Sequence, residues 1–337
     1  MESTGTEPRG DRGQLIIVIS LVLATLFVAL ALILNSGIYA ENLSTRETTD
    51  SSDVSLTIQQ VDRETREAMR AANRIEESQD PDEAIGNFTA SFDAVSVAVA
   101  NERALRGQAL DMNQTGTSGG FLLQQDNATR NYTDASRATD WTLVSDVERV
   151  SGYHLHVDRG QLADEPGMID DPNDEVFFIN LTDHSVVWRI YVYEDDNEVV
   201  LAGGNVSDDD LLDLDELEDL PVFDDEDCKA ETDTAAIDLS AGTLNGTSCP
   251  ALAFADNLSD EITVSYYNAD LGGGTYRLLV DTEDEGDIDG EFNESPDSPY
   301  KKGAVFDASV DVTFERSDVR YSTSRNVTAE PLTYEAY

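Results

Sequence analysis

The segment Leu15–Leu34, LIIVISLVLATLFVALALIL, constrains the fold most, because it has no charged residue and only two polar ones, Ser20 and Thr25. About 20 apolar residues in a helix span roughly 30 Å, the thickness of the hydrocarbon core of a bilayer. The sequence therefore predicts a transmembrane helix over residues 14–37, with Leu15–Leu34 in the lipid bilayer. A short cytoplasmic leader over residues 1–13 precedes this helix, and one large domain follows it.

Two signals orient the transmembrane helix. Arg9 and Arg12 stand just before it, and positive charge beside a span stays cytoplasmic. Asn-x-Ser/Thr sequons occur only after it, at eleven of the seventeen asparagines, where chance would give about three. We therefore predict a single-pass protein of the cell membrane with a glycosylated, extracellular C-terminal domain. The predicted glycosylation sites are Asn42, Asn87, Asn113, Asn127, Asn131, Asn180, Asn205, Asn245, Asn257, Asn293 and Asn326.

The charge is strongly negative, with 21 Lys+Arg against 69 Asp+Glu and a formal net charge of −48. Such a charge repels nucleic acid and excludes it as a partner. The lysines are few: Lys229, Lys301 and Lys302. A surface rich in carboxylates and poor in lysine is typical of extreme halophiles, in which salt screens the repulsion. A calcium-loaded surface protein is the alternative interpretation.

Cys228 and Cys249 are the two cysteines of the chain. In an oxidising compartment they would close a disulfide loop of about 20 residues, worth about 3 kcal/mol in the chain-entropy model. A free, buried pair is the alternative. No histidine lies near either cysteine in the sequence, so we predict a disulfide and no zinc site.

Two helices are expected within residues 38–114. The first carries an apolar stripe with heptad spacing over Val54–Ile75, which predicts a packing surface for self-association or for pilin-like partners. The second begins at Asp80-Pro81-Asp82-Glu83, an N-cap followed by a first-turn proline and a capping-box carboxylate, and extends to about Met112. The short break predicts an extracellular helical hairpin; the alternative is that each stripe packs on the β domain.

Thr115–Gly120, TGTSGG, is predicted to be a flexible linker. Beyond it, over residues 121–337, apolar residues alternate with period 2, which indicates an antiparallel β-sandwich-like domain. Residues 208–227 form an acidic insertion in this domain. The fold class is thus α+β, with an N-terminal transmembrane helix, a helical hairpin and a β-rich domain. The expected strands are Tyr153–Asp158, Val176–Leu181, Val186–Tyr193, Val199–Ala202, Ile262–Tyr267, Tyr276–Asp281, Val305–Phe314 and Val319–Thr323.

The junction Arg12-Gly13-Gln14 stands immediately before the apolar run. It resembles a class III signal peptide, which prepilin peptidase cleaves ahead of the hydrophobic helix. The sequence over Arg12–Arg46 is similar to the opening of type IV pilin-like membrane proteins of halophilic archaea. The resemblance implies cleavage between Gly13 and Gln14 and a helix that packs into a filament core. In many bacterial pilins a glutamate stands five residues after the cut, where this chain has Val18.

Candidate chemical sites are weak. His154 and His156 would share one strand face and could bind a metal ion with His184, but plain surface histidines are the favoured interpretation. Glu285–Gly290 resembles an EF-hand loop but has Pro296 where the last ligand belongs. Irregular ion sites at Asp208–Asp210 or Asp281–Asp289 stay open as a lesser alternative to solvated loops. We predict no metal and no cofactor.

The chain contains no G-x-S-x-G motif and no P-loop, so we predict that it is not an enzyme. The first functional hypothesis is a pilin-like cell-surface or filament-associated subunit. The second is a bitopic adhesin or receptor whose β domain binds a ligand. A membrane-tethered hydrolase is a distant third.

Overall fold

The computed structural model describes residues 53–75, 78, 80–164, 175–183, 186–206, 225–254, 261–293, 299–317 and 319–329. The segment Leu15–Leu34, the junction Arg12–Gln14 and residues 208–224 of the acidic insertion lie outside this part of the chain. Of the helices that are described, none is both long and apolar enough to span a membrane. The chain divides into two units, Met1–Gln60 and Val61–Tyr337, and all of the described strands belong to the second.

Two helices open the described chain: residues 53–73 are helical, and α2 covers Pro81–Ala104. The start of α2 is as predicted, since Asp80 is the N-cap and its side chain accepts a hydrogen bond of 2.9 Å from the backbone N–H of Glu83. The predicted end near Met112 is wrong. Gly107 has a φ of +73°, which ends the helical geometry, and a strand begins at Ala109.

The two longest strands, β1 (Ala109–Gln125) and β13 (Tyr300–Arg316), have 17 residues each. They pair antiparallel along their lengths, from Ala109↔Glu315 to Gln124↔Tyr300. A strand of this length extends roughly 55 Å, three times the usual value. The pair therefore runs through both the helix-covered part of the molecule and the β domain.

The flexible linker predicted at Thr115–Gly120 is wrong, because these six residues lie in the middle of β1. Thr115 and Gly116 are exposed, whereas Gly119 and Gly120 are buried and allow close packing. A Cβ atom on Gly119 would lie 2.5 Å from Cβ of Pro81, and one on Gly303 of β13 would collide with the carbonyl oxygen of Asp80. The N-terminal end of α2 thus rests directly on the backbone of β1 and β13.

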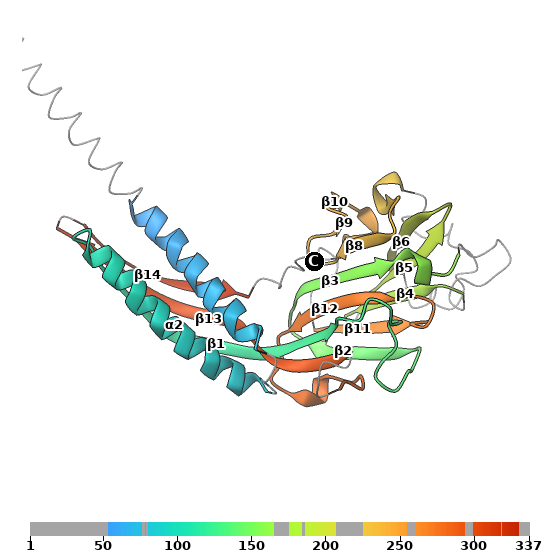
Figure 1. Cartoon of the computed structure of the whole chain (residues 1–337), viewed down its shortest axis with the longest axis horizontal. Helices are drawn as coiled ribbons and strands as arrows, with labels where there is room; N and C mark the ends of the chain where they lie inside the picture. Colours follow the sequence, from blue (N-terminus) through green and yellow to red (C-terminus); the bar gives the residue numbers. More distant parts are fainter. Residues whose placement is uncertain are drawn as a thin grey trace, which may run out of the picture. The chain divides into compact units, whose positions relative to one another are not determined.

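The strands form two antiparallel sheets. The eight-stranded sheet has the order β10-β9-β8-β3-β12-β1-β13-β14, and the six-stranded sheet has the order β2-β11-β4-β5-β6-β7 (Figure 1). Their bounds are β2 Trp141–Val147, β3 Val150–Asp158, β4 Phe177–Thr182, β5 Val187–Asp195, β6 Glu198–Val206, β7 Lys229–Ala230, β8 Thr234–Asp238, β9 Thr243–Leu244, β10 Thr247–Ser248, β11 Ile262–Tyr267, β12 Gly274–Val280 and β14 Val319–Thr328.

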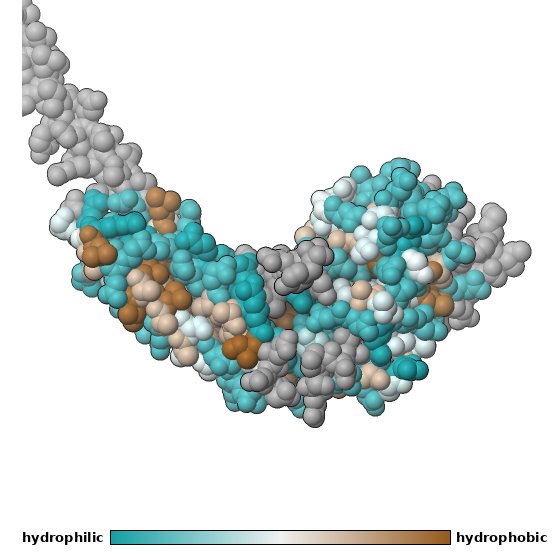
Figure 2. Space-filling view, in the orientation of Figure 1, coloured by the Kyte–Doolittle hydropathy of each residue, from teal (hydrophilic) through white to brown (hydrophobic). Residues whose placement is uncertain are grey.

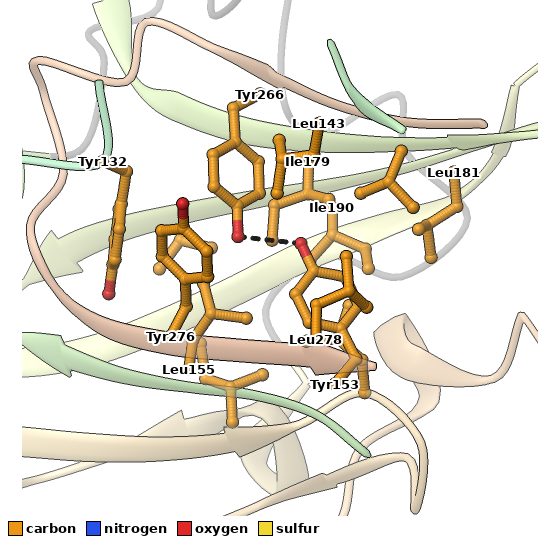
Figure 3. Packing of buried hydrophobic residues seen from close by; sticks show 14 of the residues in the cluster. Tyr132, Leu143, Tyr153, Leu155, Ile179, Leu181, Ile190, Tyr266, Tyr276 and Leu278 are labelled. Carbon is orange, nitrogen blue, oxygen red and sulfur yellow. Dashed lines mark hydrogen bonds between the residues drawn. The ribbon is translucent and has the colours of Figure 1, made fainter. Parts of the chain in front are cut away.

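The two sheets share one hydrophobic core. At its centre lie four fully buried tyrosines, Tyr132, Tyr153, Tyr266 and Tyr276, among aliphatic side chains from both sheets (Figure 3). The hydroxyl of Tyr153 donates to that of Tyr266 at 2.9 Å, and the two rings come from β3 and β11, one strand of each sheet. Burial raises the pKa of all four phenols, so they stay neutral.

Both helices pack on the eight-stranded sheet. α2 contacts β1 and β13. Asp62 accepts from Arg325 of β14 in two hydrogen bonds of 3.0 and 2.7 Å, and Asn73 bonds to Val305 of β13. These contacts show that the helices run in opposite directions along the sheet. The structure thus combines the two alternatives weighed from the sequence: the helices run in opposite directions, as in a hairpin, and both pack on the eight-stranded sheet.

The heptad stripe over Val54–Ile75 is used largely inside the chain. Four of its members in the second unit, Val61, Thr65, Ala68 and Ala72, are each at most 3% exposed, whereas Ile75 at its end is 38% exposed. A side chain that already packs within the subunit cannot also pack against a partner. The self-association surface predicted for this stripe is therefore already covered from Val61 to Ala72.

Asn73 closes the sheet where β14 ends. The last pair between β13 and β14 is Asp307↔Thr328, and two residues earlier Val305 has its backbone exposed on that edge. The buried amide of Asn73 replaces the missing strand: its Nδ2 donates to the carbonyl of Val305 at 3.0 Å, and its Oδ1 accepts from the N–H of Val305 at 2.7 Å.

Arg149 fastens the long strand pair to the β domain. Its Nη2 lies 2.5 Å from Asp281, just after β12, and 2.6 Å from Asp307 of β13. Its guanidinium also lies 4.6 Å from the ring centroid of Phe306. Burial raises the pKa of Asp281, and the neighbouring Arg149 opposes that shift. One cation thus neutralises two largely buried carboxylates at this junction.

The predicted α+β class is confirmed, as are the antiparallel strands expected from the period-2 pattern. β1, β2 and the short strands β7–β10 were missed. β1 was missed because its middle is Thr, Ser and Gly, and the strands β7, β9 and β10 are too short, at two residues each, to show a period.

We predict that Asn73→Ala lowers the free energy of unfolding by about 1–3 kcal/mol, because it leaves a buried N–H and C=O without partners. Asn101→Ala on the exposed side of α2 is the matched control and should change stability by less than about 0.5 kcal/mol. Denaturant unfolding of both variants checks this. Equal stability of the two variants would contradict the role of Asn73.

Candidate functional site

The strongest candidate site is a groove on the outer face of the eight-stranded sheet, with a volume of about 280 Å³. Tyr153, Leu155 and Val157 of β3 point into the core, so His154 and His156 point outward. The strand register then places Asp238 of β8 beside His154 on one side, and Arg277 of β12 on the other. The groove is lined by these outward groups together with Ala236, Thr243, Gly246 and Thr275.

His154 and Asp238 form the charged centre of the groove. Nδ1 of His154 lies 3.4 Å from Oδ2 of Asp238, whose other oxygen accepts a 2.8 Å hydrogen bond from the backbone of Ala241. Burial lowers the pKa of His154, although Asp238 opposes the shift, and burial likewise lowers the pKa of His156. The His154 ring is therefore neutral at neutral pH, and its proton belongs on Nδ1, facing the carboxylate.

Polar atoms of His154 and Thr275 in the groove have no hydrogen-bond partner among the described residues. They are Nε2 of His154 and Oγ1 of Thr275, and Thr275 as a whole is only 4% exposed. Beside them, Arg277 contacts Asp126 at 3.2 Å, and Asp126 also accepts a 2.8 Å hydrogen bond from Tyr300. A buried polar atom without a partner is unfavourable, so these atoms have hydrogen-bonding capacity left for a ligand or ordered water.

The sequence singled out His154 and His156 but gave no signal for Asp238, Thr275 or Arg277. These residues come together only through cross-strand register, which no spacing along the chain reveals. His184, the third histidine considered for a metal site, lies outside the described residues. Within the described part of the chain, no three His, Cys, Asp or Glu side chains are grouped as metal ligands.

The carboxylates of the acidic loop over Asp281–Asp289 accept hydrogen bonds from other groups of the chain. Asp284 caps the 3₁₀ turn η6 (Glu285–Asp287) by accepting from the N–H of Gly286 at 2.8 Å, and Asp287 accepts from Thr282 at 2.6 Å. Asp289 accepts from Ser145. The carboxylates are thus directed to different partners. The other candidate ion site, Asp208–Asp210, lies outside the described residues.

Cys228 and Cys249 are joined in a disulfide, with their Cα atoms 4.9 Å apart. Cys228 immediately precedes β7, an edge strand of the six-stranded sheet, and Cys249 immediately follows β10, an edge strand of the eight-stranded sheet. The bridge therefore ties one edge of each sheet together and closes the core at that side.

The predicted glycosylation sites differ in accessibility. Asn180 is 8% exposed, and its Oδ1 accepts a 3.0 Å hydrogen bond from the buried Arg189, so this side chain is unsuited to carry a glycan. Asn87, Asn131 and Asn293 are half-buried. Asn42 and Asn257 lie outside the described residues. The exposed candidates are Asn113, Asn127, Asn205, Asn245 and Asn326.

The outer face of α2 is unusually poor in charge. Asp93 is the one charged residue between Ala84 and Asn101. Large apolar side chains are exposed along this helix, with Val97 at 61% and Leu105, just beyond its end, at 91%. In Figure 2, apolar residues gather along this part of a surface that is otherwise mostly hydrophilic. Contiguous exposed apolar surface of this kind marks contact sites.

Comparison with known proteins gives one match. Residues 9–119 are similar to a protein family described as "Family of unknown function (DUF7261)". The matched region covers about a third of the chain and ends within β1, so it includes the apolar segment and both helices but not the β domain. Searches of curated proteins and of solved structures returned no match.

We predict that both groove histidines titrate below the ordinary imidazole value of 6.5. Between that value and the lowered pKa the unfolded chain binds more protons than the folded one, so stability falls as pH falls through this window and gains nothing more above it. Imidazole NMR titration measures the midpoints. His154→Gln and His156→Gln should flatten the pH dependence of unfolding in the same window, and midpoints at or above 6.5 would contradict the assignment.

Proposed function

We propose that this chain is a non-enzymatic, membrane-anchored extracellular glycoprotein of the pilin-like kind. The proposal rests on one observation: an uncharged apolar run, Leu15–Leu34, with Arg9 and Arg12 before it and every sequon after it. A run of that length inserts as a helix, and the arginines hold its N-terminal end in the cytoplasm. The helices and the β domain then stand outside the cell.

Three further features support this proposal. A disulfide between the two sheet edges suits an oxidising, extracellular compartment. Five sequon asparagines are exposed, as glycan attachment requires. The family match begins at residue 9 and treats the end of the leader, the apolar run and the helices as one module, whereas the β domain lies outside it. The matched region anchors the protein in the membrane, and the β domain contacts its extracellular partners.

A subunit role is supported by the outer face of α2. Two copies that each carry a formal charge of −48 repel one another over most of their surfaces. The charge-poor face with Val97 and Leu105 is where such copies approach at the least electrostatic cost. It takes the place of the stripe over Val54–Ile75, whose central residues pack inside the subunit.

The second candidate function is a bitopic adhesin or receptor, and the groove at His154 favours it. A concave site with unpartnered polar atoms suits ligand binding better than packing between subunits. The two functions differ in the fate of the leader, because an anchor keeps it and a pilin-like subunit loses it.

We predict that the mature protein, isolated from its native host, begins at Gln14, and that Gly13→Leu blocks this processing because the cleavage site needs a small residue. N-terminal sequencing or intact mass measures the outcome. Thr4→Leu in the same leader is the control and should leave processing unchanged. A mature chain that retains residues 1–13 would overturn the pilin-like proposal and favour the adhesin.

A further inference from the structure

We propose that the groove between β3, β8 and β12 is a binding site for a neutral sugar unit. The inference goes beyond an anchored surface protein by naming the class of ligand, and it rests on the groove alone. It holds for either fate of the leader.

The hydrogen-bonding capacity of the groove selects the ligand. The Nδ1–H of His154 faces Asp238, so its Nε2 is an acceptor that needs a donor from the ligand. The hydroxyl of Thr275 can donate or accept. The guanidinium of Arg277 is a donor held in place near Asp126. A ligand must therefore donate at one point and accept at another within a few ångströms.

Other ligand classes fail this test. A sulfate or carboxylate ion cannot donate to Nε2 of His154 and meets the negative charge of Asp238. An organic cation or a metal ion is repelled by Arg277, and His154 and Asp238 have no third ligand grouped with them in the described chain. Vicinal hydroxyl groups can donate to Nε2 of His154 and accept from Arg277, because each O–H both donates and accepts.

The shape of the groove agrees with a small, partly apolar ligand. Its volume of about 280 Å³ lies just below the usual range for ligand pockets, about 300–1,000 Å³. The methyl groups of Ala236, Thr243 and Thr275 line it together with the polar groups, and a sugar ring presents C–H faces as well as hydroxyls. One to two sugar units thus match the site.

A glycan could reach the groove from two sources. One is a glycan on another molecule. The other is the chain's own glycan at Asn245, since that sequon forms the turn between β9 and β10 and its neighbour Gly246 lines the groove. Asn245 is exposed, and its Oδ1 accepts from the backbone of Ala236, which leaves Nδ2 for attachment.

The test is NMR titration of the full chain, produced without glycosylation and held in molar salt and a detergent without a sugar headgroup. The probes are the methyl glycosides of glucose, galactose and mannose at up to about 100 mM, because a single sugar unit binds weakly. We expect saturable shifts of the His154 imidazole and the Thr275 methyl. The absence of shifts with all three glycosides would overturn the proposal.

Substitutions inside and outside the groove test which side chains bind the sugar. Thr275→Val keeps the shape but removes the hydroxyl and should weaken binding about tenfold, and His154→Ala should do the same. Thr234→Val, exposed at the end of β8 outside the groove, is the matched control and should bind as the parent chain does. Unchanged binding by both groove variants would contradict the site. Stronger shifts with sodium sulfate or zinc than with any glycoside would contradict the ligand class.

Protein isolated from the native host distinguishes the two sources of the sugar, a glycan on another molecule and the chain's own glycan at Asn245. Thr247→Ala removes the Asn245 sequon but keeps the turn. If the groove holds the chain's own glycan, this variant alone gains the ability to bind added glycoside. If the ligand is external, the variant and the parent chain bind added glycoside equally. Either result supports the site, and failure of both chains to bind, with no glycan contact to His154, would overturn it. These outcomes are independent of whether the mature chain begins at Gln14.

Discussion

The antiparallel pairing of β1 with β13 is the constraint on which the rest of the fold depends. One half of the pair forms the floor on which both helices pack, and the other half joins the rest of the eight-stranded sheet through the pairing of β1 with β12. Small residues in the middle of β1 let α2 rest on the backbone there, while Asn73 closes the open edge of β13. Arg149 then neutralises Asp281 and Asp307 at the junction. A helix-covered module and a β domain are thereby built on one continuous pair of strands.

The distribution of charged residues differs between the core and the rest of the molecule. The chain carries a formal charge of −48, whereas the core shared by the two sheets is apolar and contains neutral tyrosines. Basic residues are scarce, and two of them join separate elements: Arg325 binds a helix to β14, and Arg149 binds Asp281 and Asp307. Because salt screens the surface repulsion but affects buried pairs less, we expect such a chain to tolerate high ionic strength. The charge-poor face of α2 stands out against this background.

The sequence predicted those features that have a local signal. Alternation along Val186–Tyr193 and Val305–Phe314 located β5 and the larger part of β13, and Asp80-Pro81 located the start of α2 within one residue. It failed where the decisive contacts are distant in sequence. Thr115–Gly120 has the composition of a linker, and only its pairing with β13 makes it a strand. The groove was predictable only in part for the same reason. The spacing of His154 and His156 predicts that they share a strand face, but Asp238 and Arg277 lie beside them only because of the strand register.

Native-state hydrogen exchange along β1 tests the central claim most directly, because β1 lies in both parts of the molecule. If the strand pair makes them one cooperative unit, amides of residues 110–114 and of residues 121–125 exchange only through global unfolding, with the same opening free energy and the same denaturant dependence. If the amides of residues 110–114 exchange through a separate, lower-energy opening while those of residues 121–125 stay protected, the helix-covered part folds independently and the strand pair does not unite the molecule.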